Sequence, residues 1–234
     1  METSAATRLG LMTTAERLFA ERGINAVSAR EIAAAAGQRN TNAVKYHFGS
    51  IQDLVDAIFR YRMEPINTRR TALIEESDRQ GRAGDPYALA EAFVVPLAEL
   101  LDELHSGPAG GSWYLQFCAQ AAYTVHPDVA APGPDDIARS PWTTGLHELN
   151  ERALELGRAT LPADLAGRRW RHFAAFAVRA LAERELRLNA GPVHVTDSTA
   201  LYVADLVDAG VGILTAPCRP ETLRLATAAP PPAR

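Results

Sequence analysis

Side chains able to bind a nucleic acid are concentrated in one short stretch of the chain, around residue 40. Asn40, Thr41 and Asn42 are consecutive. Asparagine can form two hydrogen bonds with adenine, and threonine offers a base edge its hydroxyl or its methyl group. Lys45, the only lysine of the chain, follows one helical turn after Thr41 and could contact a phosphate. Arg39 could reach a phosphate or a guanine. These residue types favour contacts with both the bases and the backbone of DNA.

Two short predicted helices position these side chains. Ser28 and Glu31 form the pattern S-x-x-E, a capping box that begins a helix. That helix ends at Gly37, because glycine tolerates the left-handed backbone of a helix C-terminus. The second helix is predicted from about Thr41 to Phe48, and Ser50 marks the start of the next one. This order is typical of a helix-turn-helix, in which the second helix lies in the major groove.

The same segment resembles the TetR-type family of bacterial helix-turn-helix transcriptional regulators. The resemblance rests on A-A-A-G ending at Gly37, on V-K-Y-H-F followed by G-S-I-Q-D-L up to Leu54, and on T-x-A-x-x-L-F-A-E-R-G from Thr13 to Gly23. Two positions depart from the family pattern. The turn before Val44 is one residue longer, and Ile51 stands where the family commonly has a lysine that reaches a phosphate.

The resemblance implies a transcriptional regulator, a ligand-released repressor that acts as a homodimer on a palindromic operator in double-stranded DNA. It also implies an all-α fold, with an N-terminal three-helix helix-turn-helix domain and a larger C-terminal helical ligand-binding and dimerisation domain. Tyr46 and His47 match family positions that contact the DNA backbone. The expected DNA-binding residues are Ser28, Arg30, Arg39, Asn40, Thr41, Asn42, Lys45, Tyr46, His47 and Ser50.

Structural explanations compete with a DNA contact at several of these positions. Asn40 could be an ordinary helix cap, Tyr46 a half-buried packing residue and Arg30 a solvated arginine. Ser28 and Ser50 cap helices, although the amides exposed at those helix starts could also hold phosphates.

Composition and patterning give the wider organisation. Hydrophobic residues make up 47% of the 234 residues and aromatic residues 7%, and breaks rich in proline and glycine separate long helical patterns. This favours a helical bundle over a βαβ arrangement. We expect a DNA-binding domain over 1–62 bounded near Pro65, a helical ligand-binding and dimerisation domain over 63–217, and a disordered tail over 218–234. Helices of the second domain are predicted near 66–80, 87–104, 113–125, 141–159, 163–189 and 198–215.

Charge is distributed unevenly along the chain. The net charge is −4, but residues 1–62 contain eight basic and six acidic residues and therefore carry about +2. The basic signal is weak, but it lies in the segment that would approach DNA.

Other classes of protein find little support. No segment approaches the roughly 18 uninterrupted apolar residues of a membrane span, and the N-terminus lacks the apolar core of a signal peptide. We therefore expect a cytoplasmic protein with no membrane partner. The histidines lack metal-ligand spacing, and no catalytic motif is present, so neither an enzyme nor a metal site is expected. Cys118 and Cys218 are far apart, which suggests buried thiols.

The C-terminal part offers two further predictions. By the same resemblance, its last two long helices pair with those of a second subunit, although both could simply pack within one chain. The resemblance also implies a cavity for a small-molecule effector, and aromatic lining would favour an apolar or aromatic molecule. The candidate lining residues, which could equally be plain hydrophobic core, are Trp113, Tyr114, Phe117, Tyr123, Trp142, Trp170 and Phe173.

An alternative function is a helical small-molecule binding protein with weak or lost sequence-specific DNA reading. The missing lysine at Ile51 and the mild positive charge of residues 1–62 motivate it. This alternative predicts DNA affinity that is weak, insensitive to sequence and indifferent to Lys45.

Overall fold

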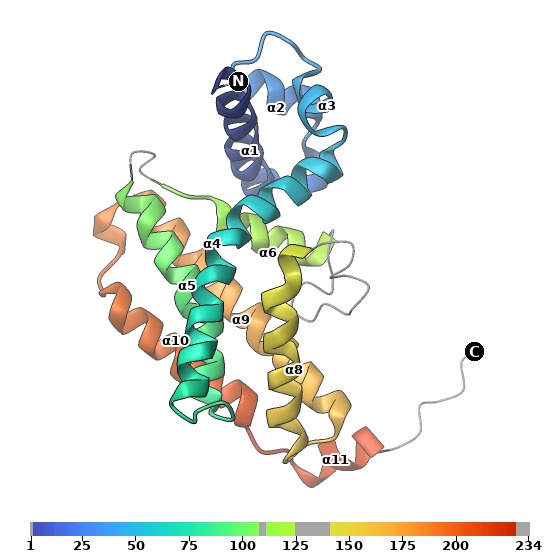
Figure 1. Cartoon of the computed structure of the whole chain (residues 1–234), viewed down its shortest axis with the longest axis vertical. Coiled ribbons are helices and arrows are strands. Elements are labelled where there is room, and N and C mark those ends of the chain that lie inside the picture. Colours follow the sequence, from blue (N-terminus) through green and yellow to red (C-terminus); the bar gives the residue numbers. More distant parts are fainter. Residues whose placement is uncertain (1, 108–110, 125–140, 228–234) are drawn as a thin grey trace, which may run out of the picture.

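The computed structural model describes residues 2–107, 111–124 and 141–227, which form a small helical domain above a larger helical body (Figure 1). Every regular element in these ranges is a helix, which confirms the predicted all-α class. No single described helix is long and apolar enough to cross a membrane; only the last two helices together, across a bend of 60°, reach that length and composition.

The small domain contains the predicted helix-turn-helix. It consists of α1 (Glu2–Arg22), a 3-10 turn (Ile24–Ala26), α2 (Ala29–Ala35), α3 (Ala43–Phe48) and the first turns of α4 (Ile51–Arg79). Glycines at positive φ end α2 and α3, with φ of 68° at Gly37 and 91° at Gly49, so both helices are short. Apolar side chains from all four helices, including Phe19, Ile32 and Val44, are buried in a hydrophobic core that continues into the larger body.

α4 contradicts the predicted break near Pro65. The helix runs without interruption from Ile51 to Arg79 and carries Pro65 in its interior, so the separate helix expected at 66–80 is the second half of α4. A proline removes one backbone donor and strains the helix. Packing compensates here, since Met63 and Ile66 on either side are both buried. The helix therefore extends from the small domain into the large one (Figure 1).

The larger body is built on the other long helices. These are α5 (Pro86–Ser106), α6 (Tyr114–Thr124), α8 (Thr144–Arg158), α9 (Ala163–Ala190), α10 (Thr199–Thr215) and the short α11 (Pro220–Thr227), with 3-10 turns at Pro141–Thr143 and Pro192–His194. The second half of α4 packs against α5, while α9 contacts α6, α8 and α10. α6 also touches α1, which joins the two domains. The predicted disordered tail was wrong over residues 220–227, where α11 forms; residues 228–234 lie outside the described residues.

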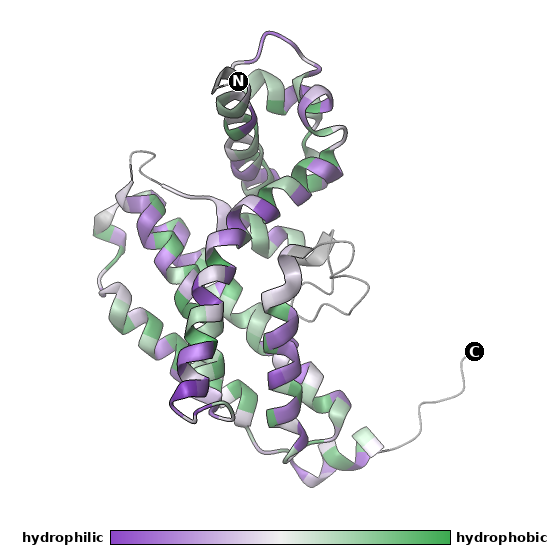
Figure 2. Ribbon diagram, in the orientation of Figure 1, coloured by the Kyte–Doolittle hydropathy of each residue, from purple (hydrophilic) through white to green (hydrophobic). Residues whose placement is uncertain are grey.

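The helices of the larger body differ in how many apolar residues they contain. α5 and α10 are rich in apolar residues, whereas α8 and the second half of α4 carry more polar ones (Figure 2). α5 has neighbours on several sides, namely α4, α8, α9 and α10. α10 packs mainly on α5 and α9, and its Leu201 is 63% exposed. One face of the apolar helix α10 is thus exposed to solvent when the chain is considered alone.

Candidate nucleic-acid interface

The start of α2 is fixed by the predicted capping box. The Ser28 hydroxyl accepts the Glu31 N–H at 3.3 Å, and the Glu31 carboxylate accepts the Ser28 N–H at 2.9 Å. Arg22, at the end of α1, donates to the same carboxylate at 2.8 Å. The pKa of Glu31 is lowered to about 2, chiefly by the hydrogen bond from the Ser28 side chain and then by that from Arg22. The cap therefore also ties α2 to α1.

The turn between the two helices uses Asn40 as a structural residue. Its side-chain oxygen accepts the Asn42 N–H at 2.9 Å, and its carbonyl accepts the Ala43 N–H at 3.1 Å. This supports the alternative explanation of Asn40 as a cap, which does not exclude a DNA contact. α3 begins at Ala43, two residues later than predicted, since this Asx turn occupies the expected first turn. Thr41 and Asn42 are exposed at the helix entry, as are Arg30 and Arg39 on the segments before it.

α3 has one buried and one exposed face. Ala43 and Val44 are buried against the core, whereas Lys45 and Tyr46 point outward. Tyr46 is 81% exposed, so the explanation of Tyr46 as a half-buried packing residue is wrong. A tyrosine this exposed can reach a ligand with its ring and hydroxyl. His47 is partly buried and meets the Tyr46 ring edge-on, with the centroids 4.9 Å apart.

The C-terminus of α3 is held by an arginine that sequence reasoning missed. Arg8 on α1 donates to the His47 carbonyl at 2.6 Å, and its guanidinium lies 4.2 Å from the centroid of the Phe48 ring. A cation at this end of a helix interacts favourably with the helix dipole. Arg8 and His47 are 39 residues apart, so no local pattern could have paired them.

Ser50 begins α4 as predicted. Its hydroxyl accepts the Asp53 N–H at 3.0 Å and donates to the Asp53 carboxylate at 2.6 Å. The acidic side chain of Asp53 thus already lies at the helix N-terminus, where it stabilises the positive end of the dipole. Ile51, in the place of the family's lysine, is partly buried against the core. Ile51 therefore cannot supply the charged phosphate contact that a lysine would make here.

Five of the seven predicted effector-lining residues fall into two buried aromatic groups. In the first, Phe59 stacks on Trp142 with centroids 4.7 Å apart and lies 5.0 Å from Phe117, next to Tyr114. In the second, Phe93, Trp170 and Phe173 are mutually 5.4 to 5.6 Å apart. Trp113 is half-buried beside the core, and the side chain of Tyr123 lies outside the described residues. The rings fill the space between one another, as in a hydrophobic core.

Buried charges lie near the junction of the two domains, which the sequence did not reveal. Arg62 on α4 donates twice to Glu16 on α1, at 2.9 and 3.0 Å, and both are almost fully buried. Burial raises the pKa of the Glu16 carboxyl, although Arg62 acts to lower it. Nearby, Glu185 on α9 is 0% exposed and accepts the Gln116 N–H at 2.8 Å. This carboxylate caps the start of α6, and burial raises its pKa.

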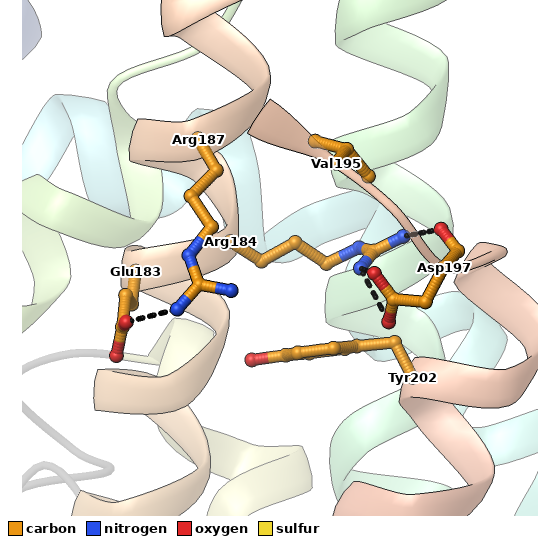
Figure 3. Close-up of a pocket in the computed structure, with 6 residues that line it drawn as sticks. All are labelled: Glu183, Arg184, Arg187, Val195, Asp197 and Tyr202. Atoms are coloured by element: carbon orange, nitrogen blue, oxygen red, sulfur yellow. Dashed lines mark hydrogen bonds and ion pairs between the residues drawn. The ribbon is translucent and has the colours of Figure 1, made fainter. Parts of the chain in front are cut away.

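A cavity of about 180 Å³ lies where the end of α9 meets the start of α10 (Figure 3). Arg184 contacts the Asp197 carboxylate at 3.2 Å and stacks 4.4 Å from the centroid of Tyr202. Arg187 pairs with Glu183. Each arginine of the cavity is thus neutralised by a carboxylate. Among the described residues no group of histidine, cysteine or acidic side chains could hold a metal ion.

Residues 11–58 match the family model described as bacterial regulatory proteins, tetR family. The N-terminal domain belongs to the TetR family. All ten predicted DNA-contacting residues lie within the matched stretch. The family comprises regulatory proteins, which agrees with the expectation that the chain is not an enzyme.

Similar proteins extend the comparison beyond this TetR-family domain. The HTH-type transcriptional repressor KstR2 of Rhodococcus jostii (strain RHA1) is 32% identical over 102 residues, or 44% of this chain and 47% of that protein. The match thus spans about half the length of the relative. The TetR-family regulator PfmR from Thermus thermophilus superposes with a TM-score of 0.51 at 16% identity, covering 89% of this chain and 96% of PfmR. This likeness supports the two-domain helical fold.

Proposed function

We propose that the protein is a sequence-specific DNA-binding transcriptional regulator, in which residues 1–62 read DNA and residues 63–217 bind an effector and dimerise. The main support for this proposal is that the N-terminal entry and the outer face of α3 are exposed. Thr41, Asn42, Lys45 and Tyr46 all reach solvent there, while the opposite face is fixed to the core of a TetR-family domain. The first residues of such a helix contact base edges, and flanking groups contact phosphates.

A homodimer would form through α9 and α10. The uncovered side of α10 exposes Leu201 together with two acids, Asp205 and Asp208, and α10 carries no basic residue. The exposed residues of α9 include Phe176, 39% exposed, and four arginines, Arg168, Arg171, Arg179 and Arg187. A two-fold axis could therefore bring basic α9 of one subunit against acidic α10 of the other.

Two subunits would read a palindrome whose half-sites are about one helical turn of DNA apart, on the order of 34 Å. An effector that binds the larger domain would act as an inducer if it favoured an arrangement with a different spacing of the two α3 helices. It can shift that equilibrium only through different affinities for the two arrangements. α4 is a continuous element through which this change could reach α3, because it extends into both domains. The proposed regulator would act in the cytoplasm as a ligand-released repressor.

Selection of bound sequences from a random duplex pool tests this function at physiological salt. Enrichment of a palindrome by the purified protein is the expected result, and a matched Lys45→Ala protein should lose yield without changing the consensus. A folded protein that enriches no sequence would instead be the alternative, a small-molecule binding protein. Ile51 and the acidic Asp53 at the start of α4 are the observations that favour that outcome.

A further inference from the structure

One arginine is buried in the proposed effector domain without a counter-ion. Arg70 on α4 is 1% exposed, and among the described residues no carboxylate forms an ion pair with it. Its Nε donates to the Ala92 carbonyl at 3.3 Å, and its Nη1 donates to the Asn67 side-chain oxygen at 2.5 Å. Its Nη2 has no hydrogen-bond partner within the described part of the chain. A buried donor left in this state is unusual in a native fold and calls for an explanation.

Helix geometry explains only one of these hydrogen bonds. In an α-helix the Ala92 carbonyl would accept the N–H of the residue four positions on, but that residue is Pro96, which has none. Arg70 replaces the missing donor. A neutral glutamine could do the same, so this contact does not account for the positive charge. Burial lowers the pKa of Arg70 to about 10, which still leaves the guanidinium charged at neutral pH.

The other two buried arginines of the described chain each form an ion pair with a carboxylate. Arg62 binds Glu16 through two hydrogen bonds, and Arg184 binds Asp197. In Figure 3 both arginines of the cavity face a carboxylate, so their charges cancel. A buried cation is normally paired in this way because desolvation of an isolated charge is strongly unfavourable. Arg184 also has a buried Nε without a hydrogen-bond partner, but its charge is compensated by Asp197. Among the buried arginines of the described residues, Arg70 is therefore the one whose charge no carboxylate compensates.

Apart from Asn67 and the Ala92 carbonyl, Arg70 has apolar neighbours that come from α5 and α8. The guanidinium lies 5.8 Å from the Phe93 ring of α5, and a Cβ on Gly145 of α8 would lie 3.3 Å from its Cδ. Ala92, which binds Arg70, also lines a cavity of about 10 Å³ between α4, α5 and α8. The other lining residues are Ile74, Ser77, Ala83, Ala88, Leu89, Leu149 and Arg152. This void holds about one water molecule, so a ligand would have to widen it.

We propose that Arg70 binds the carboxylate of an effector whose remaining part is apolar and enters between α4, α5 and α8. The unused Nη2, together with Nη1, offers the two parallel donors that a carboxylate accepts, once Asn67 gives up its hydrogen bond. Ala92, Ile74 and Leu149 would then contact the apolar part. This assignment rests on the proposed function only in calling the ligand an effector; binding itself does not require DNA.

The test compares carboxylic acids with their uncharged amides. The probes are the straight-chain acids from hexanoate to dodecanoate and the phenyl-substituted acids from phenylacetate to 4-phenylbutyrate, each beside its primary amide. The melting temperature and the tryptophan fluorescence of the full chain report binding. We expect at least one acid to raise the melting temperature, with its amide binding at least tenfold more weakly. Equal binding of acid and amide, or no acid that binds, would overturn the assignment.

Two variants locate the carboxylate at Arg70. Arg70→Gln keeps a donor for the Ala92 carbonyl but removes the charge, and it should weaken the acid at least tenfold while leaving amide binding unchanged. Asn67→Asp places a carboxylate next to Nη1 within the chain and should exclude the acid to a similar extent, although it removes the Asn67 Nδ2 donor to the Trp142 carbonyl. The melting temperature of each variant without ligand shows whether it folds. Arg152→Gln, on the wall of the same cavity but paired with Asp78, is the matched control and should retain the preference. An acid preference that survives Asn67→Asp would place the anion elsewhere.

The duplex selection separates this inference from the proposed function. A protein that prefers acids through Arg70 but enriches no DNA sequence would keep the ligand site and contradict the regulator. A protein that enriches a palindrome but binds acid and amide equally would support the regulator and contradict the carboxylate site at Arg70.

Discussion

At the scale of single residues, Lys45 is the position where affinity and specificity can be separated. Its side chain is exposed on α3, and a phosphate contact would be independent of sequence. Lys45→Ala should weaken binding to all duplexes and reduce the salt slope of log K by about one. Titrations at several salt concentrations measure both. Arg60→Ala, an exposed basic residue further along α4, is the control. An unchanged slope would remove Lys45 from the DNA contacts.

Thr41 and Asn42 should behave differently from Lys45. Both are exposed where α3 begins, the part of a recognition helix that contacts base edges. Replacing either by Ala should cost about 1–3 kcal/mol on the preferred site and relax the preference at one base pair. Binding to the selected palindrome and to its single-base variants gives these values. A loss that is equal on every duplex would argue that these side chains hold the backbone.

Sequence reasoning succeeded at residues whose partners are close along the chain. The bonds of Ser28 with Glu31 and of Ser50 with Asp53 were predictable because a cap spans only three residues. The Arg8 contact with His47 and the pair of Arg62 with Glu16 were not, since 39 and 46 residues separate the partners. The exposure of Tyr46 was also open, because a six-residue helix is too short for periodicity to assign its faces.

At the scale of elements, the cap of α2 gives the domain a pH-dependent stability. The folded pKa of Glu31, about 2, lies below its ordinary value of 4.5. Its contribution to folding is therefore complete above pH 4.5 and is lost as the pH falls towards 2. Glu31→Gln should reduce the acid dependence of the melting temperature in that window. Glu21→Gln, at an exposed pair on α1, is the control. A profile unchanged by Glu31→Gln would show that the hydrogen bonds of the cap are not formed in solution.

Because it caps α2, Ser28 has a structural role whether or not it also contacts DNA. Ser28→Ala should lower the stability of the protein by about 1 kcal/mol, because the Glu31 amide loses its acceptor. Ser28→Thr should restore most of this, since threonine keeps the hydroxyl that accepts the Glu31 N–H and donates to the Glu31 carboxylate. Denaturant unfolding of the three proteins measures the difference. If Ser28→Ala is as stable as the parent chain, the capping hydroxyl is dispensable.

Element boundaries were predicted well where glycine ends a helix and poorly where tertiary packing decides. Gly37 ends α2 with a positive φ that other residues rarely adopt, so the local signal was sufficient. Pro65 gave an equally strong local signal for a break, yet Met63 and Ile66 on either side of it are buried, and α4 continues through the proline. The distinction matters for function, because a break at Pro65 would separate the effector domain from α3.

At the scale of the whole molecule, the buried Arg62–Glu16 pair joins α1 to α4 at the base of the DNA-binding domain. Removing one partner leaves an uncompensated buried charge, so Glu16→Met should cost about 3–5 kcal/mol. Glu16→Met with Arg62→Met should be close to the parent chain in stability, because burial already raises the pKa of Glu16 and the pair carries a desolvation penalty. Denaturant unfolding of the parent chain, the two single variants and the double variant measures these differences in stability. Additive losses would show that the two side chains do not depend on each other.

The dimer can be tested with two glycines of α10 that point in opposite directions. A Cβ on Gly210 would lie 2.4 Å from the Phe173 ring of the same chain, whereas a Cβ on Gly212 would meet nothing within 4 Å. Gly210 therefore serves packing within one subunit, and Gly212 lies on the face proposed for the partner. Gly212→Gln should leave the monomer folded but shift sedimentation from dimer to monomer.

Loss of the dimer should also weaken binding to a palindrome by more than about tenfold, because the second half-site then no longer binds as part of the same molecule. Gly10→Gln, at another glycine with open space around it, is the control for the added side chain and should remain dimeric. Gly210→Ala should instead lower the melting temperature through its contact with Phe173. If Gly212→Gln remains as dimeric as the parent chain, the two-fold contact does not use this face of α10, and the spacing of the two α3 helices must be set elsewhere.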